Sequence, residues 1–154
     1  MESYKHRFAK ETLARWLADP EQDLVDFRNA TGGGHFGGGV FMEYPFCVTA
    51  NDELRGEESW HEIEERWDPD PPSYEECLRL NWRPLVIFDV ALHHKGFISD
   101  AFEVVHKHDI HDDKLMWIHR IKHETGLRAV RGLSADWILN QVGRPSKLKT
   151  IWTI

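Results

Sequence analysis

Two mainly apolar runs near the middle of the chain are the strongest pattern in the sequence. Residues 84–92 (PLVIFDVAL) and residues 97–107 (FISDAFEVVHK) are rich in β-branched and aromatic residues, so each predicts a strand. The intervening HHKG predicts a hairpin turn. Because apolar residues occupy both faces of these strands, the pattern is typical of central strands that are covered on both sides.

Helical spacing of apolar residues predicts two longer helices, at residues 3–18 and 112–126, the second ending at Gly126. In the first helix, His6 and Lys10 are four residues apart and share a different face from the apolar stripe. The residues expected to face the interior are Tyr4, Phe8, Leu13, Trp16 and Leu17 in the first helix, and Leu115, Ile118 and Ile121 in the second.

Shorter elements complete the expected order. Strands are predicted at VFMEYPFCVTA, LRAVRG and KTIWTI, and short helices at residues 56–67, at SYEECL and at SADWILNQV, the last capped by Ser134. The glycine-rich residues 31–39 predict a loop or hairpin turn, since a strand and not a helix follows them. We therefore expect one α/β domain over residues 1–154, with an acidic insertion around 51–72.

Composition narrows the class of protein. The chain of 154 residues is 41% hydrophobic, which favours a folded domain, and no apolar run approaches the roughly 20 residues of a membrane span. The first residues lack the apolar core of a signal peptide, and Cys47 and Cys77 are isolated, so we expect a cytoplasmic protein with reduced thiols and no membrane partner.

Charge is distributed unevenly despite the formal net charge of −7. From Lys114 onward the acidic residues are only Glu124 and Asp136. The basic residues of this part are Lys114, Arg120, Lys122, Arg128, Arg131, Arg144, Lys147 and Lys149. A basic C-terminal third is compatible with nucleic acid as a partner, although on charge alone it is equally compatible with a solvated surface.

Two acidic residues interrupt the predicted hairpin strands. If the turn is centred on Gly96, Asp89 lies directly opposite Glu103, with their Cβ atoms roughly 4.5–5.5 Å apart. Two carboxylates in an apolar layer repel each other and lose hydration, so a shared proton, a buried Lys or Arg, or a bound cation must compensate. A shift of one residue in the turn would place them on opposite faces.

A hard divalent cation is one of these compensating groups. Paired carboxylates suit Mg²⁺ or Mn²⁺, which makes Asp89 and Glu103 candidate metal ligands. A zinc site is an alternative, since His106, His108 and His111 cluster with acidic residues. His106, however, is predicted on the strand face opposite to Glu103, which disfavours zinc at the carboxylate pair.

The order of these segments resembles the PD-(D/E)xK nucleases, and more narrowly the competence-protein CoiA-like nuclease family. The segments that carry the resemblance are KHRFAKETLARWL, SYEECL, FDVALHHKG, FEVVHKH and HDDKL. The resemblance implies an α-β-β-β-α-β core with a mixed sheet flanked by helices. It also implies that Asp89 and Glu103 hold a catalytic metal ion, and that water attacks a phosphodiester of a nucleic acid, expected to be DNA.

Two positions depart from the family pattern. Val105 stands where the motif has its lysine, and Leu85 follows the proline where an ideal motif has its first acid. The lysine is expected to have migrated, with Lys114 preferred and Lys10 second. Lys107 is about 13 Å from Glu103 along the strand and is disfavoured. His108 is a candidate for positioning or proton transfer beside the carboxylates.

These residues lead to one preferred function and two alternatives. The preferred function is a metal-dependent phosphodiesterase, weakened by the loss of the motif lysine. The first alternative is an inactive nuclease fold that binds nucleic acid or a partner protein, and the second is a zinc-binding interaction module.

Overall fold

Six strands form one mixed sheet in the computed structural model, which describes residues 2–19, 24, 39–48, 54–55, 83–94, 97–107 and 110–154. Their order across the sheet is β2-β1-β3-β4-β5-β6, and neighbours are antiparallel except for the parallel pair β4 and β5. The strands are β1 (Val40–Val48), β2 (Leu54–Arg55), β3 (Arg83–His94), β4 (Phe97–Val105), β5 (Ala129–Ser134) and β6 (Trp152–Thr153).

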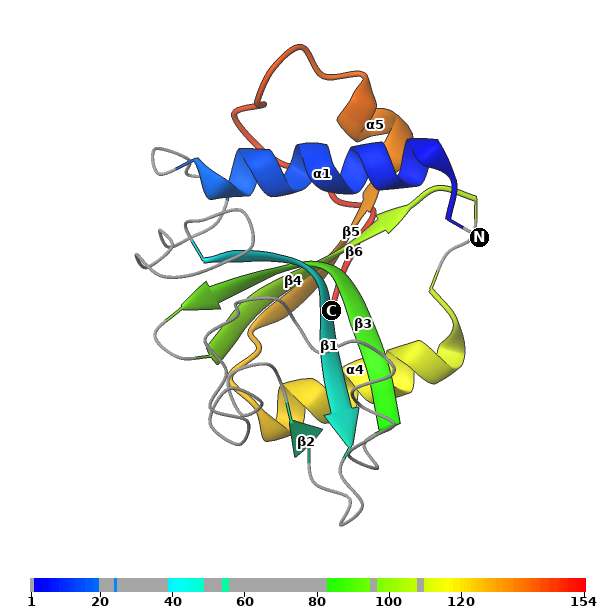
Figure 1. Cartoon of the computed structure of the whole chain (residues 1–154), viewed down its shortest axis with the longest axis vertical. Helices are drawn as coiled ribbons and strands as arrows, with labels where there is room; N and C mark the ends of the chain where they lie inside the picture. Colours follow the sequence, from blue (N-terminus) through cyan, green and yellow to red (C-terminus); the bar gives the residue numbers. More distant parts are fainter. Residues whose placement is uncertain are drawn as a thin grey trace.

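Helices cover both faces of this sheet (Figure 1). Helices α1 (Tyr4–Ala18) and α5 (Ala135–Leu139) pack together over one face, in a core that includes Leu13, Val90 and Val104. Helix α4 (Asp112–Glu124) lies on the other face, where Ile118 and Ile121 are fully buried, and it forms the crossover between the parallel strands β4 and β5.

The described elements confirm the predicted class, an α/β fold with a mixed sheet flanked by helices. The succession α1, β1, β3, β4, α4, β5 has the predicted order of helices and strands. Strand β2 lies inside the segment that was predicted to be an acidic insertion. The helices predicted at residues 56–67 and at SYEECL, and nearly all of the glycine-rich loop, lie outside the described residues.

Serine side chains cap the N-termini of helices α1 and α5. The Ser3 side chain accepts a hydrogen bond from the His6 amide at 3.1 Å, and Ser134 accepts one from the Trp137 amide at 3.3 Å, as predicted for Ser134. Helix α4 ends at Glu124 with Thr125 as its C-cap, two residues before the predicted Gly126. None of the helices in the described part is long and apolar enough to cross a membrane.

The predicted apolar stripe of α1 is only partly correct. Leu13, Trp16 and Leu17 are buried, but Tyr4 is 82% exposed and Phe8 is 42% exposed. The first half of the helix instead buries Ala9 and Lys10, because a short alanine lets the helix approach the sheet and Lys10 meets acidic partners there. Tyr4 and Phe8 stack on each other outside the core, with ring centroids 6.1 Å apart.

The β3–β4 hairpin has the predicted register next to the two acidic residues, but only because a bulge near the turn restores it. Ala91 pairs with Ala101 and Val90 with Phe102, as expected from a turn centred on Gly96. Nearer the turn, however, His94 pairs with Phe97, and an irregularity after Leu92 shifts the register by one residue. Without this bulge the two acidic residues would not oppose each other.

Candidate functional site

A row of five positions crosses the sheet and organises the site. Glu103 pairs with Gly132 of β5, and Gly132 pairs with Trp152 of β6. Continuing the register of the neighbouring pairs places Asp89 opposite Glu103 and Glu43 of β1 opposite Asp89. Strands β1, β3, β4, β5 and β6 therefore contribute one residue each to this cross-strand row. The row consists of Glu43, Asp89, Glu103, Gly132 and Trp152.

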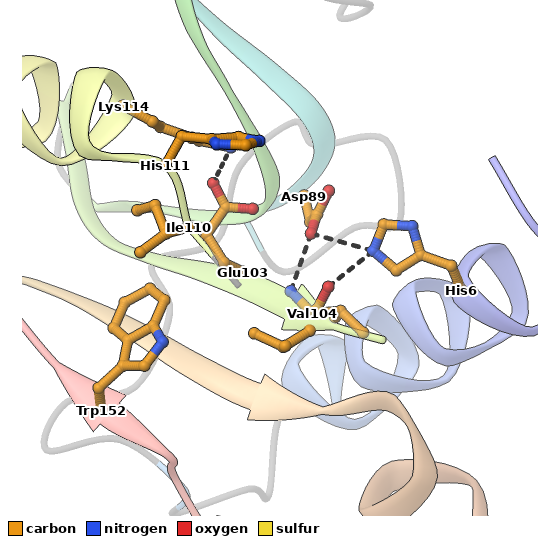
Figure 2. A pocket seen from close by; sticks show the side chains of 9 residues that line it. His6, Asp89, Glu103, Val104, Ile110, His111, Lys114 and Trp152 are labelled. Carbon is orange, nitrogen blue, oxygen red and sulfur yellow. Dashed lines mark hydrogen bonds and ion pairs between the residues drawn. The ribbon is translucent and has the colours of Figure 1, made fainter. Parts of the chain in front are cut away.

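Strands β3 and β4 part at the cross-strand row, and side chains replace the main-chain hydrogen bonds (Figure 2). The described β3–β4 pairs end at Val90 and Phe102. Beyond them, the Val104 amide donates to Asp89 Oδ2 at 2.8 Å, and His6 Nε2 lies 2.7 Å from the Val104 carbonyl oxygen. Because a carbonyl can only accept, His6 Nε2 carries the proton. The polar main chain is thus satisfied without closing the sheet over the carboxylates.

Glu103 is the more perturbed of the two carboxylates. It is 7% exposed and forms an ion pair with Lys114, which comes from the first turn of α4. Burial, together with the negative charge of Asp89, raises the pKa of Glu103 to about 8 in spite of Lys114. The Glu103 Oε1 atom is buried, and it is the oxygen that the Lys114 ammonium group approaches in this ion pair. Glu103 therefore holds a proton near neutral pH unless a further cation is present.

Asp89 stays ionised for the opposite reason. Burial alone would raise its pKa, but hydrogen bonds from His6, Glu103 and the Val104 amide outweigh burial and lower the pKa of Asp89. His6 Nε2 lies 3.5 Å from Asp89 Oδ2, and this contact raises the pKa of His6. The pKa values of the two opposed carboxylates are thus moved in opposite directions. Asp89 is ionised, and Glu103 carries a proton.

Lys10 supplies a second positive charge from α1. Its side chain is almost completely buried, forms ion pairs with Glu2 and Glu43, and has its Nζ atom 3.7 Å from Asp89 Oδ1. Burial would lower the pKa of Lys10, but the hydrogen bonds to both glutamates raise it. His6 and Lys10 are four residues apart on one polar face of α1 and both contact Asp89. Glu2, which precedes the helix, forms ion pairs with both of them.

The opening between β3 and β4 is a pocket of about 230 Å³. Its charged end is formed by His6, Asp89, Glu103 and Lys114, and its apolar end includes Ile110 and Trp152 (Figure 2). The pocket therefore exposes both carboxylates to a small ligand that has a charged part and an apolar part.

The structure brings most of the predicted site residues together. Asp89, Glu103 and Lys114 line the pocket, and Lys10 lies behind Asp89. Lys107 is exposed beyond the end of β4, as expected. His108 lies outside the described residues. The sequence reasoning did not assign His6, Glu43 or Trp152 to the site, although the shared helical face of His6 and Lys10 was a usable signal for His6.

The donor atoms around the carboxylate pair determine which metal ion it could hold. Within the described ranges, no group of three or more His, Cys, Asp or Glu side chains is placed to hold a metal ion. Mg²⁺, however, is commonly held by one or two carboxylates with water completing the shell. Asp89 and Glu103 supply such a pair, with the Lys114 ammonium group beside Glu103 Oε1. The two carboxylates therefore match the kind of donor pair that commonly holds Mg²⁺ or Mn²⁺.

Comparisons with protein-family models, with curated proteins and with solved structures find no match.

The raised pKa of Glu103 predicts a stability that falls as pH rises. Its proton is retained in the folded protein above the unfolded pKa of 4.5, so the stabilisation is complete below pH 4.5 and lost towards pH 8, by up to about 1.4 kcal/mol per pH unit. His6 adds a smaller loss of the same sign above pH 6.5, while the lowered pKa of Asp89 acts only in acid. Urea unfolding in EDTA between pH 5 and 9 measures this dependence.

Two variants control the pH experiment. Glu103→Gln is expected to remove most of the slope, because glutamine does not titrate. Glu124→Gln, at a more exposed glutamate paired with Arg120, is expected to keep it. A wild-type free energy of unfolding that does not change between pH 5 and 8 would contradict the buried, protonated state of Glu103.

Proposed function

We propose that the protein is a metal-dependent phosphodiesterase of the CoiA-like nuclease kind that cleaves nucleic acid, with DNA as the expected substrate. One observation carries the proposal: Asp89 and Glu103 meet in an open pocket beside Lys114. Their opposed pKa shifts support it, since strongly perturbed titrating groups in a cleft are typical of functional sites.

The residues have distinct roles in this proposal. Asp89 and Glu103 would hold Mg²⁺ or Mn²⁺, which when bound polarises a phosphoryl oxygen and lowers the pKa of a bound water. Lys114 is placed to stabilise the negative charge that develops on the phosphate, in place of the lysine absent at Val105. His6 and the Val104 amide hold the Asp89 carboxylate in place. Exposed basic residues such as Lys147 and Lys149 would attract the phosphate backbone.

Cleavage of labelled oligonucleotides and plasmid by purified protein tests the proposal. We expect weak cleavage that requires a divalent cation, is faster with Mn²⁺ than with Mg²⁺, and disappears in EDTA. An Asp89→Asn variant, purified in the same way, excludes a contaminating nuclease if it is inactive. Cleavage that persists in EDTA, or in this variant, would contradict the proposed site.

A second candidate function is favoured by Val105 at the position of the motif lysine. In this function the motif lysine has been lost, and Lys114 neutralises the carboxylate pair in place of a metal ion. The fold would then bind nucleic acid or a protein partner without cutting. Binding of DNA by an inert wild-type protein, across both metals, would support this function and overturn the first.

Metal binding at the carboxylate pair predicts a rise in thermal stability. A cation that binds only the folded state at 100 times its Kd stabilises by about 2.7 kcal/mol, so Mn²⁺ should raise the Tm. Asp89→Asn should abolish the rise, whereas Asp113→Asn, at an exposed position in the first turn of α4, should keep it. Scanning calorimetry with and without Mn²⁺ measures both, and an unchanged wild-type Tm at millimolar Mn²⁺ would count against a metal site.

A further inference from the structure

Trp152 lies at the pocket because its neighbour in the sheet has no side chain. Gly132 pairs with Glu103 on one side and with Trp152 on the other, so all three belong to the cross-strand row. The indole ring of Trp152 lies over the Gly132 backbone, and a Cβ atom at Gly132 would overlap it. Glycine at this position therefore lets a large aromatic side chain reach across β5 towards the carboxylates.

The position of Trp152 divides the pocket into two chemically different ends. Asp89 and His6 lie on one side of Glu103, and Ile110 and Trp152 lie on the other (Figure 2). Lys114 and His111 reach Glu103 from the start of α4. Trp152 is partly exposed, so part of the indole is available to a ligand. A nucleotide has the matching composition, with a charged phosphate at one end and a planar base at the other.

We propose that Trp152 is a base-stacking residue that holds one unpaired nucleobase beside the phosphodiester at Asp89 and Glu103. The proposal rests on the proposed function and narrows it to a substrate class, single-stranded nucleic acid or an unpaired end. A base inside a duplex has both faces covered by its neighbours, so it cannot stack on a side chain within a pocket unless it leaves the stack. Every base has a π-face, so the contact selects unpaired strands and not a particular sequence.

The pocket and the surrounding charge agree with this assignment. A volume of about 230 Å³ is below the roughly 300–1,000 Å³ of sites for drug-sized ligands, so the pocket has room for one base beside the carboxylates and not for a longer stretch of strand. The segment that leads into Trp152 carries the exposed side chains of Lys147 and Lys149. Positive charge next to an aromatic platform is the usual combination in proteins that bind single strands.

Binding of oligothymidylate and of an abasic oligomer of equal length tests the role of Trp152. The measurement uses the full chain in EDTA, so that cleavage does not interfere, with fluorescence anisotropy as the readout. Wild type is expected to bind the base-bearing oligomer about 5- to 150-fold more tightly than the abasic one. Trp152→Leu should lose this preference with little change in affinity for the abasic oligomer, and Trp152→Phe should retain part of it.

Further measurements separate stacking from a purely structural role of Trp152. Trp137→Phe is the matched control, because Trp137 packs edge-on against Trp16 over the opposite face of the sheet and should not affect the preference. Should both Trp152 variants fail to fold, 2-aminopurine in an oligonucleotide bound to wild type should still be quenched by stacking. An unquenched signal would overturn the proposal.

The outcomes for Trp152 and for the proposed function are distinguishable. Equal affinity of wild type for base-bearing and abasic oligomers, together with metal-dependent cleavage, would overturn stacking by Trp152 and leave the phosphodiesterase intact. A strong preference of wild type for duplex over single strands would also overturn it. Absence of both cleavage and nucleic-acid binding would overturn the two proposals together.

Discussion

Replacement of Lys114 by alanine is expected to lower metal-dependent cleavage by about 10²–10³-fold, and Glu103→Gln is expected to remove it. Lys114 is the cation in contact with Glu103, and its Nζ atom also donates to the Ile87 carbonyl at 3.3 Å, which fixes the side chain at the pocket. Losing a fixed charge at the place where negative charge develops costs rate and not folding, because α4 is anchored by Ile118 and Ile121. Single-turnover cleavage of a labelled oligonucleotide measures the loss.

Lys107→Ala is the matched control for Lys114→Ala. Lys107 carries the same charge but is exposed beyond β4, so its removal should change the rate less than a few-fold. A Lys114→Arg variant should recover part of the rate, since it keeps the charge with a different geometry. Equal effects of the two alanine variants would show that Lys114 acts only through the net charge of the protein.

Replacement of Lys10 by methionine is expected to destabilise the protein by about 3 kcal/mol. The substitution keeps the volume of the buried side chain but removes the charge that faces Asp89, Glu2 and Glu43. Lys5→Met is the control on the same helix: Lys5 pairs with Asp136 where both side chains are exposed, and such pairs contribute at most about 1 kcal/mol. Urea unfolding at pH 7 compares the two variants.

A double variant identifies the partner responsible for the effect of Lys10. Lys10→Met combined with Asp89→Asn should be less destabilised than the sum of the single variants, because no uncompensated buried charge remains. If Lys10→Met unfolds no more easily than Lys5→Met, Lys10 does not neutralise the acidic residues, and the carboxylate pair depends on Lys114 alone.

Sequence patterns were sufficient for the fold class and for the acidic pair. Runs of β-branched and aromatic residues located the long strands, and helical spacing of apolar residues located both long helices, because these elements bury continuous apolar surface. The pairing of Asp89 with Glu103 also followed, but only because the bulge after Leu92 compensates for the actual position of the turn. A bulge has no reliable signature in a sequence, so a correct register there was partly fortuitous.

Other features depended on contacts between distant segments, which no local pattern specifies. The sequence shows Tyr4 and Phe8 at helical spacing, yet Lys10 and not Phe8 is buried. The reason is that Glu43 and Asp89, on the strands facing α1, form ion pairs with Lys10. The role proposed for Trp152 depends on Gly132, its partner on the adjacent strand and twenty residues away in the chain. The lysine nearest Glu103 was predicted because α4 follows β4 after a short connection, which is a local relation.

The parting of β3 and β4 makes one backbone proton sensitive to the chemistry of the site. The Val104 amide donates to a carboxylate and not to a carbonyl of the next strand. Its chemical shift in a ¹⁵N–¹H spectrum and its rate of exchange with deuterium therefore depend on the charge of Asp89. A single resonance, far from any introduced label, thus follows protonation and cation binding at the pocket separately from turnover.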